Sequence, residues 1–308
     1  MKRLIRIGFL LVALGFGAWA VVSKWDGIRA GFAQLSWQAL ALSLVAVVAA
    51  LCGGMMTWRS LLADLGSPLP FRPAAKVFFV GQLGKYIPGS LWPVLAQMEM
   101  GRELGVPRSR SAAAFFLTLP VQLGSGLVIS GVTLLASLPS SAAPYAWVFL
   151  LIPVLAVVFE PRVINALLTF GLRRLGREPL ERPLTRAGML TALGWALLGW
   201  TAYGLHLAAI VHDFGLSGAS LIPFSVGAFA LSWCLGIMTF VVPAGAGVRE
   251  VAMVVVLAPV LGEGPAITVA LCSRIVIILG DLVCAGAAGI AARRDVGPTH
   301  DQTTGKPV

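Results

Sequence analysis

Six apolar stretches dominate this chain, and most of them are long enough to cross a lipid bilayer as a helix. A helical span needs about 20 apolar residues, because lipid offers no hydrogen-bond partner to an exposed backbone. Hydrophobic residues make up 58% of the 308 and charged residues only 12%, which is too apolar for one water-soluble core. The predicted full spans are residues 4–22, 37–57, 112–137, 145–159, 187–211 and 265–291.

Two further apolar stretches are interrupted by glycine and proline. Residues 71–101 break at Gly84-Lys85-Tyr86-Ile87-Pro88-Gly89, and residues 221–261 break at Pro243-Ala244-Gly245-Ala246-Gly247. Because glycine and proline end or kink helices, each stretch is interpreted as two half-helices that meet at the break.

The distribution of Lys and Arg predicts the orientation. With both broken stretches treated as re-entrant hairpins, 18 of the 23 basic residues fall in cytoplasmic segments and only Lys24 and Arg29 fall outside. The other three, Lys85, Arg249 and Arg274, lie at membrane depth. This asymmetry places both termini in the cytoplasm. If the first hairpin crossed fully, every later loop would flip and the arginine-rich segment 162–186 would lie outside, which the asymmetry disfavours.

The predicted fold is an all-α polytopic membrane protein with about six spans and two oppositely oriented re-entrant hairpins. Residues 37–137 and 187–291 form an inverted repeat within a single transmembrane domain, residues 1–294. A surface helix is expected near residues 164–175, and residues 295–308 form a disordered cytoplasmic tail. Two alternatives stay open: helices kinked only for packing, and cleavage of the first span as a signal peptide near Ala18-Trp19-Ala20.

Charged residues at membrane depth indicate where a ligand could bind, because burying a charge in lipid is expensive. Half-helices that begin beside the two breaks would direct free N–H groups and partial positive charge at the same region. Together these groups predict a site for an anionic headgroup, a phosphate or phosphodiester. Its predicted ligand-binding residues are Lys85, Tyr86, Gly89, Gly245, Gly247, Arg249 and Arg274. Glu250 and Asp281 are the predicted counter-ions or proton-coupling groups. The alternative reading of Arg274 and Asp281 is one structural ion pair, or two separate pairs with other helices.

Other chemistries find little support in the sequence. The four cysteines lie in apolar stretches without metal-ligand spacing, so we expect no metal, no cofactor and no disulfide framework. His206 lies within a span and is interpreted as a packed residue. The net charge of +10 is attributed to cytoplasmic loops on anionic lipid, not to nucleic-acid binding. No nucleophile–base couple is visible, so the protein is not expected to be an enzyme.

Two motifs stand out at the breaks. The first is Gly84-Lys85-Tyr86-Ile87-Pro88-Gly89-x-x-Trp92, followed by Arg102 and Gly105-Val106. The second is Pro243-x-Gly245-x-Gly247-x-Arg249-Glu250, together with Arg274. In this order and spacing they resemble the motifs of a known family, the lysylphosphatidylglycerol synthase transmembrane (flippase-like) domains, and the resemblance covers residues 37–291. Members often carry a Glu-Arg pair after the first break, where this chain has Thr118-Leu119-Pro120-Val121-Gln122, so the site is concentrated on the second repeat.

The resemblance implies a multi-pass protein of a prokaryotic cytoplasmic membrane that moves lipids between leaflets. The chain ends soon after Ala291, which suggests a stand-alone member without the synthase domain. The expected function is translocation of an anionic phospholipid or a polyprenyl-phosphate-linked lipid. The first alternative is a non-catalytic membrane partner of a glycosyltransferase or lipid-modifying enzyme, and the second is a membrane-embedded transferase.

Overall fold

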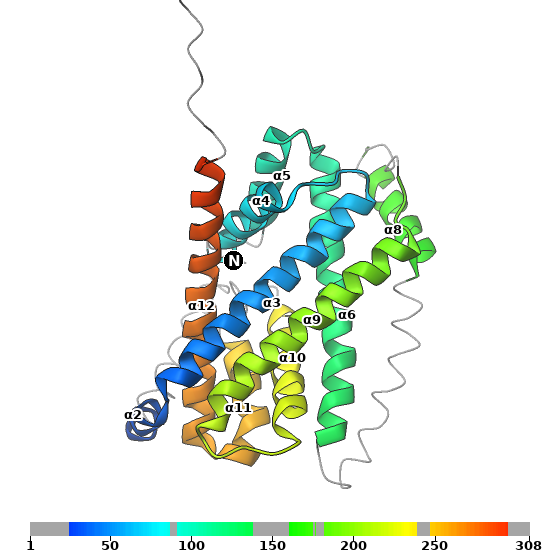
Figure 1. Cartoon of the computed structure of the whole chain (residues 1–308). Helices are drawn as coiled ribbons and strands as arrows, with labels where there is room; N and C mark the ends of the chain where they lie inside the picture. Colours follow the sequence, from blue (N-terminus) through cyan, green and yellow to red (C-terminus); the bar gives the residue numbers. More distant parts are fainter. Residues whose placement is uncertain are drawn as a thin grey trace, which may run out of the picture.

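The computed structural model of this chain describes residues 25–86, 91–137, 160–174, 176, 182–238 and 247–294. Within these ranges the regular structure is entirely helical, which confirms the all-α class (Figure 1). The elements are α2 (Trp25–Gln34), α3 (Trp37–Asp64), α4 (Phe71–Ala75), η1 (Lys76–Val80), η2 (Leu83–Tyr86), α5 (Trp92–Glu103), α6 (Arg108–Ser137), α8 (Pro161–Arg174), α9 (Arg186–His212), α10 (Leu221–Met238), α11 (Val248–Leu261) and α12 (Glu263–Arg294).

Five of these helices, α3, α6, α9, α10 and α12, are long and apolar enough to cross a membrane. Four of them contain predicted spans, namely 37–57, 112–137, 187–211 and 265–291. The predicted spans 4–22 and 145–159 lie outside the described residues. Helix α10 differs from the expectation, because its 18 residues would suffice for a crossing although we assigned it to a hairpin. The count of six spans therefore stays a prediction.

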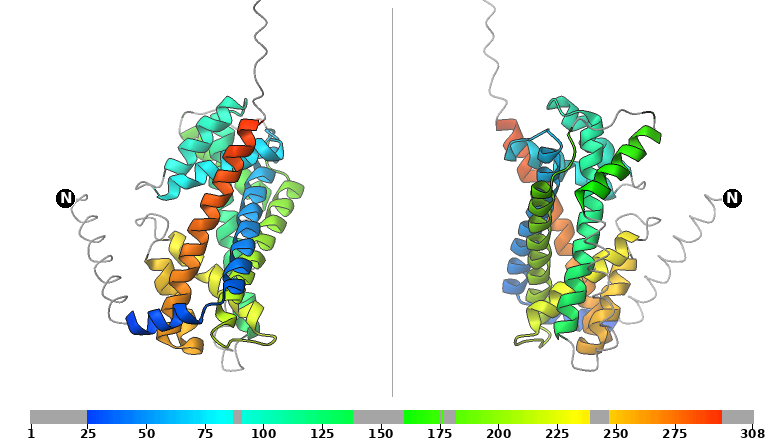
Figure 2. Two further views of the ribbon diagram at one scale, coloured as in Figure 1. Left: turned by 60° about the vertical axis from the view of Figure 1, so that its left-hand side comes forward. Right: turned by 90° about the vertical axis from the view of Figure 1, so that its right-hand side faces the viewer.

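The two broken stretches lie at opposite ends of the bundle (Figures 1 and 2). We call α4, η1, η2 and α5 the first hairpin, and α10 and α11 the second hairpin. Along the first hairpin, the α-helix α4 is followed by the wider π-helix η1 and then by the tighter 3-10 helix η2, before α5 begins. Helix α12 runs the height of the bundle and contacts α4, η1, η2 and α11, so it touches both hairpins. Re-entrance itself stays a prediction, whereas the surface helix expected near residues 164–175 is confirmed as α8.

Helices α3 and α9 cross side by side at the centre of the bundle (Figure 1). Glycine makes this close approach possible, because a Cβ at Gly53 would lie only 2.9 Å from the Cα of Gly199. Near the crossing, the Trp58 and Trp200 side chains are fully buried. The crossing fixes the positions of the elements that carry the charged interior.

Each of these two helices caps the other. The N–H and Oγ of Ser36, the N-cap of α3, donate to Asp213 Oδ2 at 2.7 and 2.9 Å. At the opposite end, the N–H and Oγ1 of Thr185, the N-cap of α9, donate to the Asp64 carboxylate at 2.7 and 2.8 Å. The same shift of 149 residues converts Ser36 into Thr185 and Asp64 into Asp213. The helices are therefore antiparallel and paired in the register that the predicted inverted repeat would require.

Removing either cap should destabilise the bundle by a similar amount. We expect Ser36→Ala and Thr185→Ala each to lower the free energy of unfolding by about 1 kcal/mol, since each hydroxyl satisfies a free N–H of the first helical turn. Thermal unfolding in detergent would measure both. Thr201→Ala is the matched control, because that exposed hydroxyl bonds only to its own helix. Equal melting temperatures for all three variants would contradict the mutual capping.

Candidate functional site

Charged side chains gather in the interior where α12 passes the two hairpins. In the described part of the chain, each hairpin pairs one charged residue with an opposite charge on α12. Asp281 and Arg274 lie two turns apart on that helix, about 10 Å along its axis. The alternative reading of Arg274 and Asp281 as two separate ion pairs with other segments is therefore the arrangement observed.

The first pair joins the first hairpin to α12. Lys85 Nζ lies 2.6 Å from Asp281 Oδ2, and the Tyr86 hydroxyl donates to the same oxygen at 2.5 Å. Only 4% of the Asp281 side chain is exposed, against 27% for Lys85. The 3-10 helix η2 brings these two consecutive side chains to one carboxylate. These two contacts hold η2 of the first hairpin against α12.

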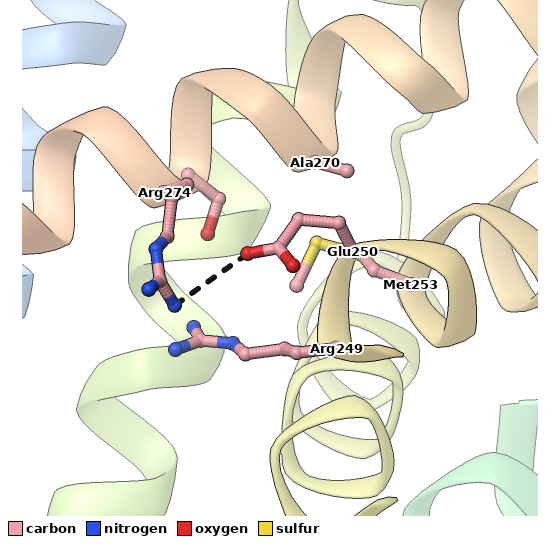
Figure 3. Close-up of a pocket in the computed structure, with 6 residues that line it drawn as sticks. Arg249, Glu250, Met253, Ala270 and Arg274 are labelled. Atoms are coloured by element: carbon pink, nitrogen blue, oxygen red, sulfur yellow. Dashed lines mark ion pairs between the residues drawn. The ribbon is translucent and has the colours of Figure 1, made fainter. Parts of the chain in front are cut away.

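The second pair lies at the start of α11 (Figure 3). Gly247 precedes this helix with φ of 88°, a left-handed conformation that favours glycine. Its N–H donates to Glu250 Oε2 at 2.6 Å, while Glu250 Oε1 lies 3.5 Å from Arg274 Nη1. The Glu250 carboxylate therefore accepts a hydrogen bond at the N-terminus of α11 and at the same time forms an ion pair with the Arg274 guanidinium.

The positive charge of Arg249, the residue next to Glu250, has few compensating contacts. Only 8% of the residue is exposed, and its Cζ lies 4.6 Å from the centre of the Phe229 ring. This cation–π contact compensates one face of the guanidinium. Nη2 has no hydrogen-bond partner among the described residues. In Figure 3 the guanidinium groups of Arg249 and Arg274 lie close together beside Glu250.

These side chains line one small pocket between α11 and α12. Its lining consists of Arg249, Glu250, Met253, Ala270, Ser273 and Arg274. The described interior charges are three cations and two carboxylates, so the region carries one positive charge in excess. Burying an uncompensated guanidinium is unfavourable by several kcal/mol, and an anion in the pocket would remove that penalty. The arrangement is thus complementary in charge to an anion, and the pocket would have to widen to admit one because it has no room for a water-sized molecule in this structure.

The structure divides the predicted site residues into two groups. Arg249, Arg274 and Glu250 lie together, whereas Lys85 and Tyr86 lie with Asp281. Gly247 starts α11, but the N–H there is already occupied by Glu250 and not open to a ligand. The predicted residues Gly89 and Gly245 lie outside the described residues. Joint binding of one phosphate by Lys85 and the two arginines stays a prediction.

Three contacts of the site were missed by sequence reasoning. Ser273 lines the pocket, Phe229 supports Arg249, and Tyr203 stacks on Phe229 with 4.5 Å between ring centres. Ser273 had one usable signal, its position next to the intramembrane Arg274. The aromatic residues had none, because nothing in the largely apolar pattern of α9 and α10 marks the face of α10 that meets α11 or the face of α9 that meets α10.

A glycine of α10 allows α11 to approach closely enough to place Arg249. A Cβ at Gly236 would lie 2.9 Å from Arg249 Cβ. We expect Gly236→Val to destabilise the protein by about 1–3 kcal/mol through overpacking, measured by thermal unfolding. Gly194→Val is the matched control, because a Cβ on that α9 glycine meets nothing within 4 Å. Equal stability of the two variants would contradict the close approach.

Comparison with known proteins supplies one finding about family. A family described as the lysylphosphatidylglycerol synthase TM region matches residues 5–284, which include every predicted site residue. Curated proteins provide no matching relative.

Proposed function

This chain belongs to the family of the lysylphosphatidylglycerol synthase transmembrane region, and on that premise we propose that it is a lipid translocase. Its substrate would be an anionic phospholipid or a polyprenyl-phosphate-linked lipid. One observation carries the proposal: the buried Arg249 guanidinium has a nitrogen without a partner and faces a pocket with one excess positive charge. Such a group is retained most readily where a ligand completes it.

In this proposal the phosphate competes with Glu250. The carboxylate already binds the N-terminus of α11 and Arg274, so it is an internal substitute for the headgroup. An arriving phosphate would take its place between Arg249 and Arg274, whose planar guanidinium groups match phosphate oxygens. Because the displaced Glu250 carboxylate competes for the same contacts, it lowers the affinity of the pocket for the phosphate. A lower affinity permits release of the lipid into the opposite leaflet. The acyl or prenyl chains would stay in the bilayer.

The charge distribution supports an orientation for this machinery. One end of the bundle holds the end of α3, the starts of α6 and α9 and the end of α12, with α4, α5 and α8 beside them (Figure 1). Its basic residues are Arg59, Arg72, Lys76, Arg102, Arg108, Arg110, Arg162, Arg173, Arg174, Arg182, Arg186, Arg293 and Arg294. We assign this end to the cytoplasm of a prokaryotic plasma membrane, with both termini on that side. The first hairpin would then enter from the cytoplasm and the second from outside, as parts of an inverted repeat.

Reconstitution tests the proposal directly. The purified protein would be placed in liposomes carrying trace fluorescent phosphatidylglycerol, phosphatidylcholine or a polyprenyl-phosphate analogue in both leaflets. A membrane-impermeant reductant then bleaches outer-leaflet probe, and translocation exposes the inner pool. Protein-dependent bleaching of an anionic probe beyond the outer-leaflet fraction supports a translocase. Bleaching that never exceeds that fraction with any probe would contradict it and favour the partner role considered from the sequence.

A further inference from the structure

One titratable residue next to the pocket has no part in the proposed headgroup contacts. His206 of α9 is completely buried and bridges two other helices. Its Nδ1 lies 2.6 Å from Ser43 Oγ on α3, and its Nε2 lies 2.8 Å from Ser273 Oγ on α12. Ser273 in turn lines the pocket with Arg249 and Arg274. A hydrogen-bonded chain therefore leads from the pocket to a buried imidazole.

The chemistry of the ring makes this chain sensitive to protonation. A neutral imidazole has one N–H and one bare nitrogen, so one serine must donate to it and the other must accept. With the proton on Nδ1, Ser273 donates to the bare Nε2 and presents only lone pairs to the pocket. With the proton on Nε2, Ser273 accepts from the ring and its own O–H is free to donate to an anion. An anion in the pocket therefore favours a protonated Nε2.

The surrounding charges determine what happens at the other nitrogen. Facing His206 are Ser43 from α3, Ser273 from α12 and the edge-on ring of Phe229 from α10. Arg249 of α11 contacts the same Phe229 ring as His206, so a protonated imidazole would lie near a second cation. Burial away from water and a neighbouring cation both disfavour the charged form of an imidazole in general.

The nearby ionisable groups Glu250 and Tyr203 contact residues other than His206. Glu250 is occupied by Gly247 and Arg274, and Tyr203 stacks on Phe229 one helical turn before His206. A bound phosphodiester would cancel the excess positive charge of the pocket and accept from Ser273. Both effects favour a proton on Nδ1 in addition to the one on Nε2, with the Ser43 hydroxyl then turning to a carbonyl of the preceding turn.

We propose that His206 is the proton-binding residue of this translocase and takes up a proton from water when an anionic headgroup enters the pocket. The inference rests on the proposed function and adds a co-substrate to it. The repeat register supports a dedicated role. The 149-residue shift that relates the caps converts Ser43 and Thr57 into Ala192 and His206, and Thr57 Oγ1 does approach the Ala192 carbonyl at 3.4 Å. The equivalent position in the other half is thus a residue that cannot titrate.

Isothermal titration calorimetry of the purified protein in detergent tests this inference. Dioctanoyl-phosphatidylglycerol is the probe, because its phosphodiester does not titrate near neutral pH and every proton taken up must come to the protein. Titrations at about pH 6.5, near the ordinary pKa of histidine, in buffers of different ionisation enthalpy give the number of protons bound per lipid. We expect uptake of a measurable fraction of a proton, and an affinity that falls by at most about tenfold per pH unit as pH rises.

Variants identify the residue that takes up the proton. His206→Gln should still bind the lipid while proton uptake disappears, and a melting curve confirms that this variant is folded. Ser273→Ala retains the imidazole but loses the hydrogen bond to the phosphodiester, so we expect weaker binding and fewer protons taken up per lipid bound. His212→Gln, at the exposed end of α9, should keep full uptake. Uptake that persists in His206→Gln, or is lost only in Glu250→Gln, would overturn the inference and leave the anion site standing. Absence of any binding heat with the unsubstituted protein would overturn the inference, whereas the proposed function fails only if the liposome assay also exposes none of the anionic probes.

Discussion

Arg249→Met is expected to abolish lipid translocation and at the same time to make the protein more stable. The guanidinium would contribute charge-assisted hydrogen bonds to a phosphate, and losing two of them weakens binding by at least about 3 kcal/mol, or more than about 100-fold. In the empty protein the same group is buried with one nitrogen unpartnered. Removing a buried charge that lacks a full set of partners relieves its desolvation penalty, which is on the order of a few kcal/mol. Loss of function with a gain in stability would identify a ligand site.

Two further variants give this prediction its controls. Arg249→Lys keeps the charge but lacks the planar fork, so we expect a rate between those of the unsubstituted protein and Arg249→Met. Arg173→Met removes an arginine that is exposed on α8, and it should change neither bleaching in liposomes nor the melting temperature. A folded Arg249→Met variant that translocates anionic probe at the full rate would rule out the site. A variant that is inactive because it has unfolded would instead show that Arg249 is structural.

Much of the architecture was predictable because lipid restricts what a chain can do. Spans such as α3 and α12 follow from apolar length alone, and the helix ends near Tyr86 and Gly247 follow from glycine and proline. The length of α10 shows where this reasoning ends. Eighteen apolar residues fit a crossing or one limb of a hairpin equally well, and which applies depends on the packing of α10 against α6, α9 and α11 and not on its own sequence.

Partners within the site were less predictable than its members. The sequence places Arg274 and Asp281 on one helix, two turns apart, but not the segments opposite them. Lys85 was expected beside the arginines because all three are cations at membrane depth. The structure pairs Lys85 with Asp281, a contact that the sequence did not indicate, while joint binding of a phosphate by Lys85 and the arginines stays a prediction. Likewise, the sequence around His206 does not indicate that its two ring nitrogens contact serines on two different helices.

Lys85→Met is expected to have the largest effect on stability, because it leaves a buried carboxylate behind. Asp281 is only 4% exposed and receives both Lys85 Nζ and the Tyr86 hydroxyl on one oxygen. Removing one member of a buried ion pair typically destabilises by about 3–5 kcal/mol, since the remaining charge is desolvated and uncompensated. Thermal unfolding would measure the loss. Tyr86→Phe should have a smaller effect, about 1.5–3 kcal/mol for one hydrogen bond to a charged group.

The double replacement Lys85→Met with Asp281→Leu separates the cost of an orphaned charge from any role of the pair in transport. Both charges disappear together, so most of the lost stability should return. A double variant as unstable as Lys85→Met would mean that Lys85 acts through contacts other than Asp281. If stability returns while lipid translocation in liposomes stays absent, the two charges are required for transport itself and not only for stability. Restored stability together with restored transport would reduce the pair to a structural clamp and leave transport to Arg249 and Arg274.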